Sequence, residues 1–290
     1  MRTLLVTGAA GQLGRRALAL AAQRPGLAAV GLGRSDLDIC DPDSVERAFD
    51  RYRPDVVLHA AAYTAVDAAE SHPDEAFHAN RDGTAHVARA AAARGIALLH
   101  ISTDYVFDGT AARGYLPGDP TRPLGVYGAS KLAGEEAALA AAPAHARIFR
   151  VAWLYDREGR NFLNTMLRLA AAGAPIRVVD DQTGTPTHAA HFASLLLDVA
   201  AEPDRLPPGV WHYGHRGTTT WYGFARALFA HAGLHPDLHP CTTADFPTAA
   251  ARPRYSHLDP EPLHAALGLS PVTWEDALSD CFAAKNSGRG

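Results

Sequence analysis

Short apolar runs alternate with longer alanine-rich stretches along the first 150 residues. The apolar runs are rich in β-branched residues and predict strands at residues 3–7, 28–32, 56–60, 97–102 and 147–152. The stretches between them predict helices over residues 12–23, 43–52, 74–94 and 128–141. This repeated strand and helix pattern predicts an α/β fold with a Rossmann-type doubly wound parallel sheet.

The pattern changes after about residue 155. Prolines and glycines become denser, strands are predicted at residues 176–179 and 210–213, and residues 236–262 are predicted to form a loop. We therefore expect a dinucleotide-binding domain in residues 1–153, completed by part of the later chain. Residues 154–290 are expected to form mainly a smaller α/β lobe that binds the substrate.

Composition narrows the class of protein. The chain has 290 residues and a net charge of −4, so it lacks the basic field that nucleic acid or an anionic membrane attracts. It contains no signal-peptide pattern and no apolar stretch long enough to span a bilayer. Its three cysteines are far apart, which suits a reducing compartment. We expect a soluble cytoplasmic protein with neither nucleic acid nor membrane as a partner.

A glycine-rich turn follows the first predicted strand. Gly8, Gly11 and Gly14, with Gln12 and Leu13 between them, lead directly into a predicted helix. Such a turn allows the backbone to approach a pyrophosphate, and the helix N-terminus supplies N–H groups and a positive dipole end. The position of this turn after the first strand therefore predicts a dinucleotide-binding site.

The segment after the second strand bears on which dinucleotide binds. An acidic residue for the ribose hydroxyls is common there, but this chain has Arg34. A guanidinium can pair with a 2′-phosphate, so NADPH is favoured, and NADH stays open. Asp38 and Ile39 are expected to flank the adenine.

A Tyr-x-x-x-Lys pair supplies candidate acid–base chemistry. Tyr127 and Lys131 are spaced to lie on one face of a helix, where the ammonium is expected to favour ionisation of the phenol. Of the 27 basic residues only Lys131 and Lys285 are lysines, which reduces the weight of a chance match. Ser102 and Thr103 end the fourth predicted strand, where α/β sheets bind ligands, and the Thr103 hydroxyl can bind a substrate carbonyl.

With these residues the chain resembles the extended short-chain dehydrogenase/reductase superfamily, and within it the dTDP-4-dehydrorhamnose reductases. The resemblance spans nearly the whole chain. The Asp-Gln-x-Gly-x-Pro-Thr segment at residues 181–187 is its most specific motif. The other matching segments are residues 11–14, 54–57, 60–67, 102–109, 127–135, 153–155, 159–162, 220–222, 246–248 and 252–253.

The resemblance implies reduction of the C4 ketone of dTDP-6-deoxy-L-lyxo-4-hexulose to dTDP-L-rhamnose with NADPH. In that reading Tyr127 donates the proton, Lys131 lowers the tyrosine pKa and holds the nicotinamide ribose, and Thr103 positions the keto oxygen. The remaining implied contacts are Ala61, Ala62, Tyr63 and Ser102 on the cofactor side, and Asp104, Trp153 and Arg252 on the substrate side.

Three positions depart from the family pattern. Pro117 stands where a Glu is frequent, and His191 where an Asp is common. Some relatives bridge a homodimer through a metal bound by an acidic residue of the first helix, and Arg16 occupies the matching position. We therefore expect no metal, while a homodimer remains open. The histidine groups at residues 212–215 and 231–239 lack a convincing third ligand and are expected to be packed or solvated.

Other functions on the same scaffold remain as alternatives. Nucleotide-sugar dehydratases have Asp-Glu after the threonine, whereas Asp104 is followed by Tyr105. GDP-fucose synthase has a cysteine near the position of Asp104, and no cysteine lies there in this chain. A 4-ketoreductase of another dTDP-deoxysugar is the nearest enzymatic alternative. A non-catalytic NADP-binding regulatory subunit, like that of methionine adenosyltransferase, is the alternative from another class.

Overall fold

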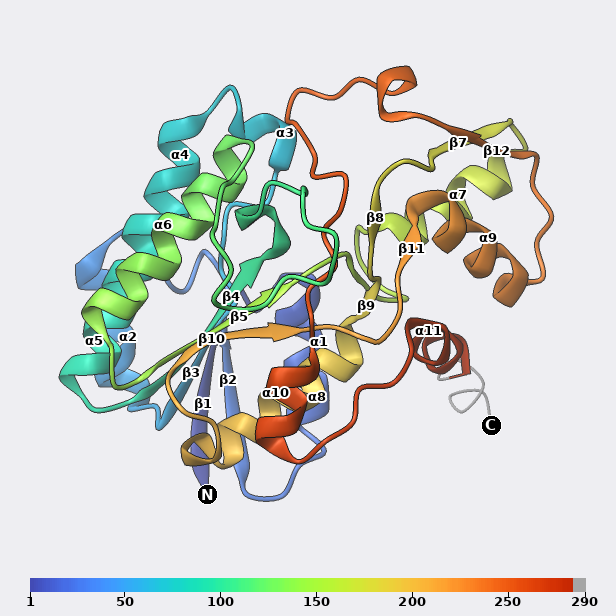
Figure 1. The fold of residues 1–290 in the computed structure, drawn as a ribbon. Coiled ribbons are helices and arrows are strands. Elements are labelled where there is room, and N and C mark those ends of the chain that lie inside the picture. The colour runs from blue at the N-terminus through green and yellow to red at the C-terminus, as the bar shows by residue number, and fades with distance from the viewer. Residues whose placement is uncertain (284–290) are drawn as a thin grey trace.

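A parallel sheet forms the centre of the molecule (Figure 1). The structure is a computed structural model and describes residues 1–283. The sheet has six strands in the order β10-β5-β4-β3-β1-β2, and every neighbouring pair is parallel. The strands are β1 (Arg2–Thr7), β2 (Leu27–Leu32), β3 (Val56–His59), β4 (Ala97–Thr103), β5 (Ala146–Val151) and β10 (Gly209–Tyr213). The doubly wound α/β prediction is confirmed.

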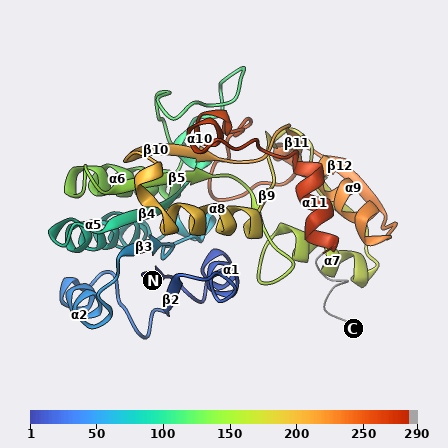
Figure 2. The same cartoon turned by 90° about the horizontal axis from the view of Figure 1, so that it is seen from below.

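Helices cover both faces of this sheet (Figure 2). One face carries α2 (Pro42–Tyr52), α5 (Thr84–Ala93) and α6 (Val126–Ala141), and the other carries α1 (Gln12–Ala21), α8 (Ala189–Ala201) and α10 (Glu261–Leu267). Successive strand residues point to opposite faces, so Leu4 packs in the core beside α1 and α8, whereas Leu5 packs beside α2 and α5. This double burial explains why the strands have continuous apolar sequences.

The helix expected over residues 74–94 is not continuous. It consists of α4 (Pro73–Phe77), a π-helical segment η1 (His78–Gly83) and α5. The wider η1 brings the Asn80 carbonyl against α6, where a Cβ at Gly134 would lie 2.2 Å from that oxygen. Apolar periodicity does not reveal this change, because the buried residues Ala76, Asn80 and Thr84 keep a helical four-residue spacing across η1.

The C-terminal lobe has a core of its own. Its main elements are α7 (Phe162–Ala172), β7 (Ile176–Val179), α9 (Trp221–Ala232), β12 (Leu238–Cys241) and α11 (Trp274–Ala283). These elements enclose a third apolar cluster, which includes Phe224 and Leu228. Shorter strand pairs lie between this lobe and the sheet: β6 (Leu154–Tyr155) with β9 (Thr187–His188), and β8 (Thr183–Gly184) with β11 (Thr219–Thr220).

Of the expectations for the later chain, one is confirmed and one needs correction. The strand predicted at residues 210–213 is present as β10, which joins the central sheet beside β5. Residues 236–262 are not all loop, because β12 pairs with β7 and a 3-10 turn, η4 (Thr243–Asp245), follows it. The sequence pattern did not predict β12, because His239 and Pro240 interrupt its run of apolar residues. Among residues 1–283, no helix combines the length and apolar character required to cross a membrane.

After η4 the chain returns from the lobe to the sheet domain. We call residues 246–253 the strap; in Figure 1 this segment descends beside α3 (Val66–Ala69). The Ala250 N–H donates to Asp67 Oδ1 of α3 at 3.0 Å. The strap therefore contacts the sheet domain at the edge where the strands end.

Candidate active site

Thr103 and Tyr127 come together at the carboxyl end of β4. Thr103 is the last residue of that strand, and Tyr127 lies in the first turn of α6. A Cβ at position 128 would lie 2.1 Å from the Tyr105 carbonyl oxygen, so Gly128 allows this turn to approach the segment that follows β4. The Thr103 hydroxyl is close enough to the Tyr127 phenol to oppose, by hydrogen bonding, a rise in its pKa.

The pKa of Tyr127 is shifted in the direction opposite to the expected one. Burial raises the pKa of Tyr127 to about 12, and the nearby Asp104 carboxylate adds to the rise. The Lys131 ammonium donates instead to the Ile101 carbonyl oxygen at 2.6 Å, and burial lowers the pKa of Lys131 to about 8. The expectation that Lys131 lowers the tyrosine pKa is therefore wrong in this arrangement, because burial of the phenol dominates.

Asp104 is a buried carboxyl group beside the phenol. Its Oδ1 accepts from the Thr103 hydroxyl at 3.1 Å, whereas its Oδ2 is buried and has no hydrogen-bond partner. Burial raises the pKa of Asp104 to about 7, and the nearby hydroxyl groups of Ser256 and Thr103 oppose this rise. An unpaired buried carboxylate oxygen is costly, so Asp104 is suited to accept from, or donate to, a ligand that binds beside Thr103.

The glycine turn forms a close-packed cradle at the N-terminus of α1. Gly8 has φ of +67°, and a Cβ there would lie 2.6 Å from the Ala61 nitrogen. A Cβ at Gly14 would lie 2.4 Å from the Gly8 carbonyl oxygen. The N-cap residue Gly11 makes no side-chain cap, so the first N–H groups of α1 lack that partner. This combination fits a dinucleotide pyrophosphate.

The loop after β3 borders the same cradle. The Ala61 N–H donates to the Thr7 hydroxyl at 3.3 Å, and the Tyr63 N–H donates to Asn80 Oδ1 at 2.8 Å. Asn80 also donates to the Tyr63 carbonyl and to the Ser130 hydroxyl. Asn80 was not predicted from the sequence, since its role depends on the π-helical turn that brings it to this loop.

The other expected cofactor residues occupy varied environments. Arg34 is exposed just beyond the carboxyl end of β2, and Asp38 is also exposed. The side chains of Leu13 and Ile39 are buried in the two main apolar cores. Gln12 Oε1 accepts from the Asn161 amide, and Ala62 lies half-buried in the loop after β3.

Ser102 belongs to a buried ionic network. Its hydroxyl donates to Glu135, which forms a salt bridge of 2.6 Å with Arg150. Both charged side chains are almost fully buried. The sequence did not reveal this pair, and the only available signal was an arginine in the middle of an apolar strand. The Ser102 hydroxyl therefore points into the protein network in this structure.

Aromatic residues form the lobe side of the site. Trp153 has φ of +47°, an uncommon conformation for a residue with a bulky side chain, and its ring stacks on Trp221 with centroids 3.6 Å apart. Backbone strain of this kind clusters at functional sites. Trp221 also packs against the third apolar cluster, so the stacked pair continues into the core of the lobe.

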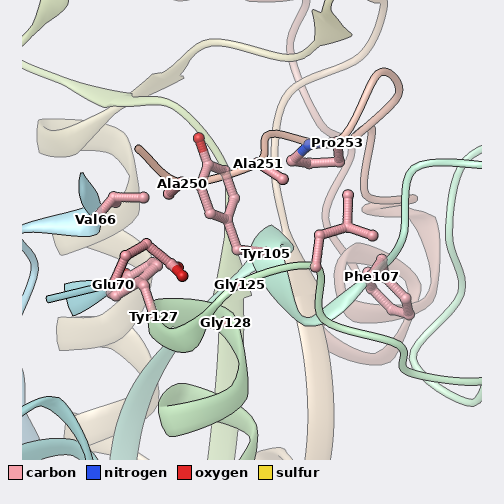
Figure 3. A pocket seen from close by; sticks show the side chains of 11 residues that line it. Val66, Glu70, Tyr105, Phe107, Gly125, Tyr127, Gly128, Ala250, Ala251 and Pro253 are labelled. Atoms are coloured by element: carbon pink, nitrogen blue, oxygen red, sulfur yellow. The ribbon is translucent and has the colours of Figure 1, made fainter. Parts of the chain in front are cut away.

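A narrow pocket opens beside Tyr127 (Figure 3). Tyr105 packs edge-on against Tyr127, with ring centroids 5.8 Å apart. The strap contributes Ala250, Ala251 and Pro253 to the pocket wall, and the adjacent helix contributes Val66 and Glu70. Arg252, expected at a substrate pyrophosphate, makes a two-pronged ion pair with Asp67 at 2.7 and 3.0 Å.

Residues 1–283 contain no group of three or more His, Cys, Asp or Glu side chains that could hold a metal ion. Arg16, at the position of an acidic metal ligand in some relatives, donates to Asp156 at 2.7 Å. This ion pair joins the first helix to the segment that leads into the C-terminal lobe.

Comparison with known proteins supplies the family. The family described as RmlD substrate binding domain matches residues 1–287. A dTDP-4-dehydrorhamnose reductase of Streptomyces griseus is 44% identical over 97% of this chain and 93% of its own. A dTDP-4-keto-6-deoxy-D-glucose reductase of Streptomyces niveus is 39% identical over 98% and 97%. The crystal structure of dTDP-4-dehydrorhamnose reductase from Bacillus anthracis in complex with NADP has a TM-score of 0.92 and 34% identity, covering 98% of this chain and 99% of that one.

These matches cover both the sheet domain and the C-terminal lobe, so they include every residue of the site described above. They confirm the resemblance that the glycine turn, the Tyr127–Lys131 pair and the segment at residues 181–187 indicated. The chain belongs to the RmlD family, that of the dTDP-4-dehydrorhamnose reductases.

Proposed function

We propose that the protein reduces the C4 ketone of dTDP-6-deoxy-L-lyxo-4-hexulose to dTDP-L-rhamnose, with NADPH as the reductant. The observation that carries this proposal is the meeting of Thr103 and a half-buried Tyr127 at the carboxyl end of β4, at the same edge of the sheet as the glycine cradle. The identity to named reductases over nearly the whole chain supports the same reaction.

Tyr127 acts as the general acid. Because burial raises the pKa of Tyr127 to about 12, the phenol is protonated throughout the neutral range and can donate to an oxygen that becomes negative. Thr103 donates a hydrogen bond to the same oxygen and so orients the ketone. The proton is transferred only when charge develops on that oxygen, which is when the phenol is the stronger acid.

The cofactor side of the site fits a dinucleotide. Gly8, Gly11 and Gly14 form the cradle for the pyrophosphate, with Gln12 and Leu13 contributing main-chain groups at the start of α1. Ala61, Ala62 and Tyr63 line the next stretch, and Arg34, Asp38 and Ile39 are assigned to the adenosine end. Lys131 is assigned to the nicotinamide ribose, and Ser102, whose hydroxyl donates to Glu135, is assigned to the same region through its main chain. When bound, NADPH supplies the hydride that reduces the ketone.

Asp104, Trp153 and Arg252 are the proposed substrate contacts. The unpartnered Oδ2 of Asp104 is available for a sugar hydroxyl, and the strained Trp153 presents a rigid aromatic surface. Arg252 can contact the nucleotide pyrophosphate while it remains paired with Asp67, because a guanidinium has five N–H donors.

The pKa of Lys131 predicts how kcat/KM changes at alkaline pH. Its ammonium loses the proton as pH rises through about 8, so kcat/KM is expected to fall above that pH. Lys131→Arg keeps the charge, so this decline disappears. Turnover nevertheless drops by about 10- to 100-fold, because the larger guanidinium cannot take the same buried position. A pH–rate profile of both proteins measures this. Full activity of the variant, or a wild-type profile that is flat to pH 10, contradicts the assignment.

Arg34 is expected to set the preference for NADPH. Removal of a charge-assisted contact to the 2′-phosphate in Arg34→Ala should raise KM for NADPH by about tenfold, while KM for NADH stays unchanged. Arg89→Ala, an exposed arginine on α5, is the matched control. Initial rates with the two cofactors measure the effect, and a wild-type preference for NADH contradicts the role of Arg34.

A 4-ketoreductase of another dTDP-deoxysugar is the second candidate. The Streptomyces niveus relative carries such a name, and the acid–base chemistry would be the same. Incubation with NADPH and a panel of 4-keto sugar nucleotides, with identification of each product, separates the two. A protein that binds NADPH but oxidises none of it with any member of the panel would instead support the regulatory-subunit alternative.

A further inference from the structure

Glu70 caps the catalytic helix from a distant part of the chain. The N-cap residue of α6, Gly125, has no side chain to accept from the first N–H groups of the helix. Glu70 Oε1 accepts from the Val126 N–H at 2.8 Å. A Cβ at Gly125 would lie 2.6 Å from that oxygen, so the glycine provides the space for the carboxylate. A negative charge at this position also suits the helix dipole.

Asp67 holds the strap from the same short helix. Its two oxygens accept from Arg252 at 2.7 and 3.0 Å, and Oδ1 also accepts from the Ala250 N–H at 3.0 Å. The Arg252 guanidinium lowers the pKa of Asp67, so the carboxylate stays charged at neutral pH. Arg252 donates in addition to the Ala250 carbonyl, which closes a compact loop at this end of the strap.

The Glu70 contact and the Asp67 contact lie on opposite sides of the pocket beside Tyr127. Glu70 reaches the residue before Tyr127, and Asp67 reaches Arg252, which lies beside the Tyr105 phenol. Tyr105 in turn packs edge-on against Tyr127. Figure 3 shows Glu70, Tyr105 and Tyr127 around the same space, with the strap on its far side. The i, i+3 spacing of the two acidic residues places them on neighbouring positions of one helical turn.

We propose that Asp67 and Glu70 are positioning residues, which act from α3 to hold the strap and the first turn of α6 on either side of the Tyr127 phenol. The proposal rests on the proposed ketone reduction for its kinetic part. Neither residue donates or accepts the reacting proton. Glu70 fixes the position of the acid, and Asp67 fixes the substrate side of the pocket, so loss of each affects a different kinetic constant.

Four variants test this assignment in the full-length protein. Glu70→Ala should lower kcat by about 10- to 100-fold and leave KM for the sugar nucleotide and Kd for NADPH within about twofold. Glu70→Gln should recover most of kcat, because its amide oxygen still accepts from the Val126 N–H. Asp67→Ala, which removes both acceptors for the strap, should mainly raise KM for the sugar nucleotide. Thr273→Ala removes a comparable cap from α11, whose Asp276 N–H donates to the Thr273 hydroxyl at 3.1 Å, and should leave both constants unchanged.

Amide hydrogen exchange provides a readout that needs no turnover. The Val126 amide should exchange faster in Glu70→Ala, and the Ala250 amide faster in Asp67→Ala, which removes the oxygen that accepts from it, with neither altered in Thr273→Ala. If the wild type fails to reduce any sugar nucleotide, the proposed function is wrong. Amide exchange at Val126 and Ala250 then remains as the test of whether Glu70 and Asp67 hold these segments. Wild-type kcat in Glu70→Ala, a loss that Gln does not rescue, or unchanged exchange at both amides would overturn the proposal.

Discussion

Tyr127→Phe is expected to lower ketone reduction by about 10²- to 10⁴-fold, because the variant keeps the ring but loses the phenol hydroxyl that the site places beside Thr103. Burial raises the pKa of this phenol to about 12, so the wild-type group is protonated at neutral pH and can donate the proton. Single-turnover oxidation of NADPH with saturating sugar nucleotide measures the chemical step.

Binding of NADPH supplies the control for this variant. The glycine cradle is formed by main-chain atoms of another part of the sheet edge, so Kd for NADPH should stay within about twofold of the wild type. Tyr52→Phe, at the end of α2, changes the same chemical group at a remote position and should leave turnover intact. Retention of more than a tenth of the wild-type rate by Tyr127→Phe would refute its role as the acid.

The largest effect on stability is expected at the buried ion pair behind the site. Arg150→Met should lower the free energy of unfolding by about 3–5 kcal/mol, because it leaves Glu135 charged and buried without its partner. Arg150 also donates to the Pro117 carbonyl and lies over the Phe107 ring. The same change therefore removes two contacts that hold the segment at residues 107–117. Denaturant unfolding measures the difference.

Two further variants identify the cause of that loss. The double change Glu135→Leu with Arg150→Met removes both charges and should recover much of the lost stability. Arg216→Met breaks an exposed ion pair with Glu261 and should leave the unfolding midpoint nearly unchanged. Equal midpoints for Arg150→Met and Arg216→Met would contradict the expected contribution of burial.

The sheet could be predicted because each strand has its own local pattern. Strands buried on both faces must be apolar at every position, and helices between them must show a 3.6-residue period, so neither depends on distant residues. β12 and η1 were not predicted, because each depends on residues that are distant in the sequence. The pairing of β12 with β7 and the turn at Asn80 are set by tertiary contacts that local patterns do not record.

The proposed catalytic residues could be located from the sequence because they lie in short motifs of fixed spacing. Thr103 ends a strand, and Tyr127 and Lys131 share a helix face, so local structure brings them to the site. The supporting contacts join residues far apart in the chain, such as Glu70 with Val126 and Asp67 with Arg252. An acidic residue on a short helix gives no sequence signal of the distant partner that it contacts. The scarcity of lysine pointed to Lys131, but only the structure showed its contact with the Ile101 carbonyl.

The most direct test of the central claim is the reaction of the purified protein with NADPH and dTDP-6-deoxy-L-lyxo-4-hexulose, with the product identified by NMR. We predict that one NADPH is oxidised for each dTDP-L-rhamnose formed, and that Tyr127→Phe abolishes both signals. No oxidation of NADPH, or a product of the opposite configuration at C4, would contradict the proposed function.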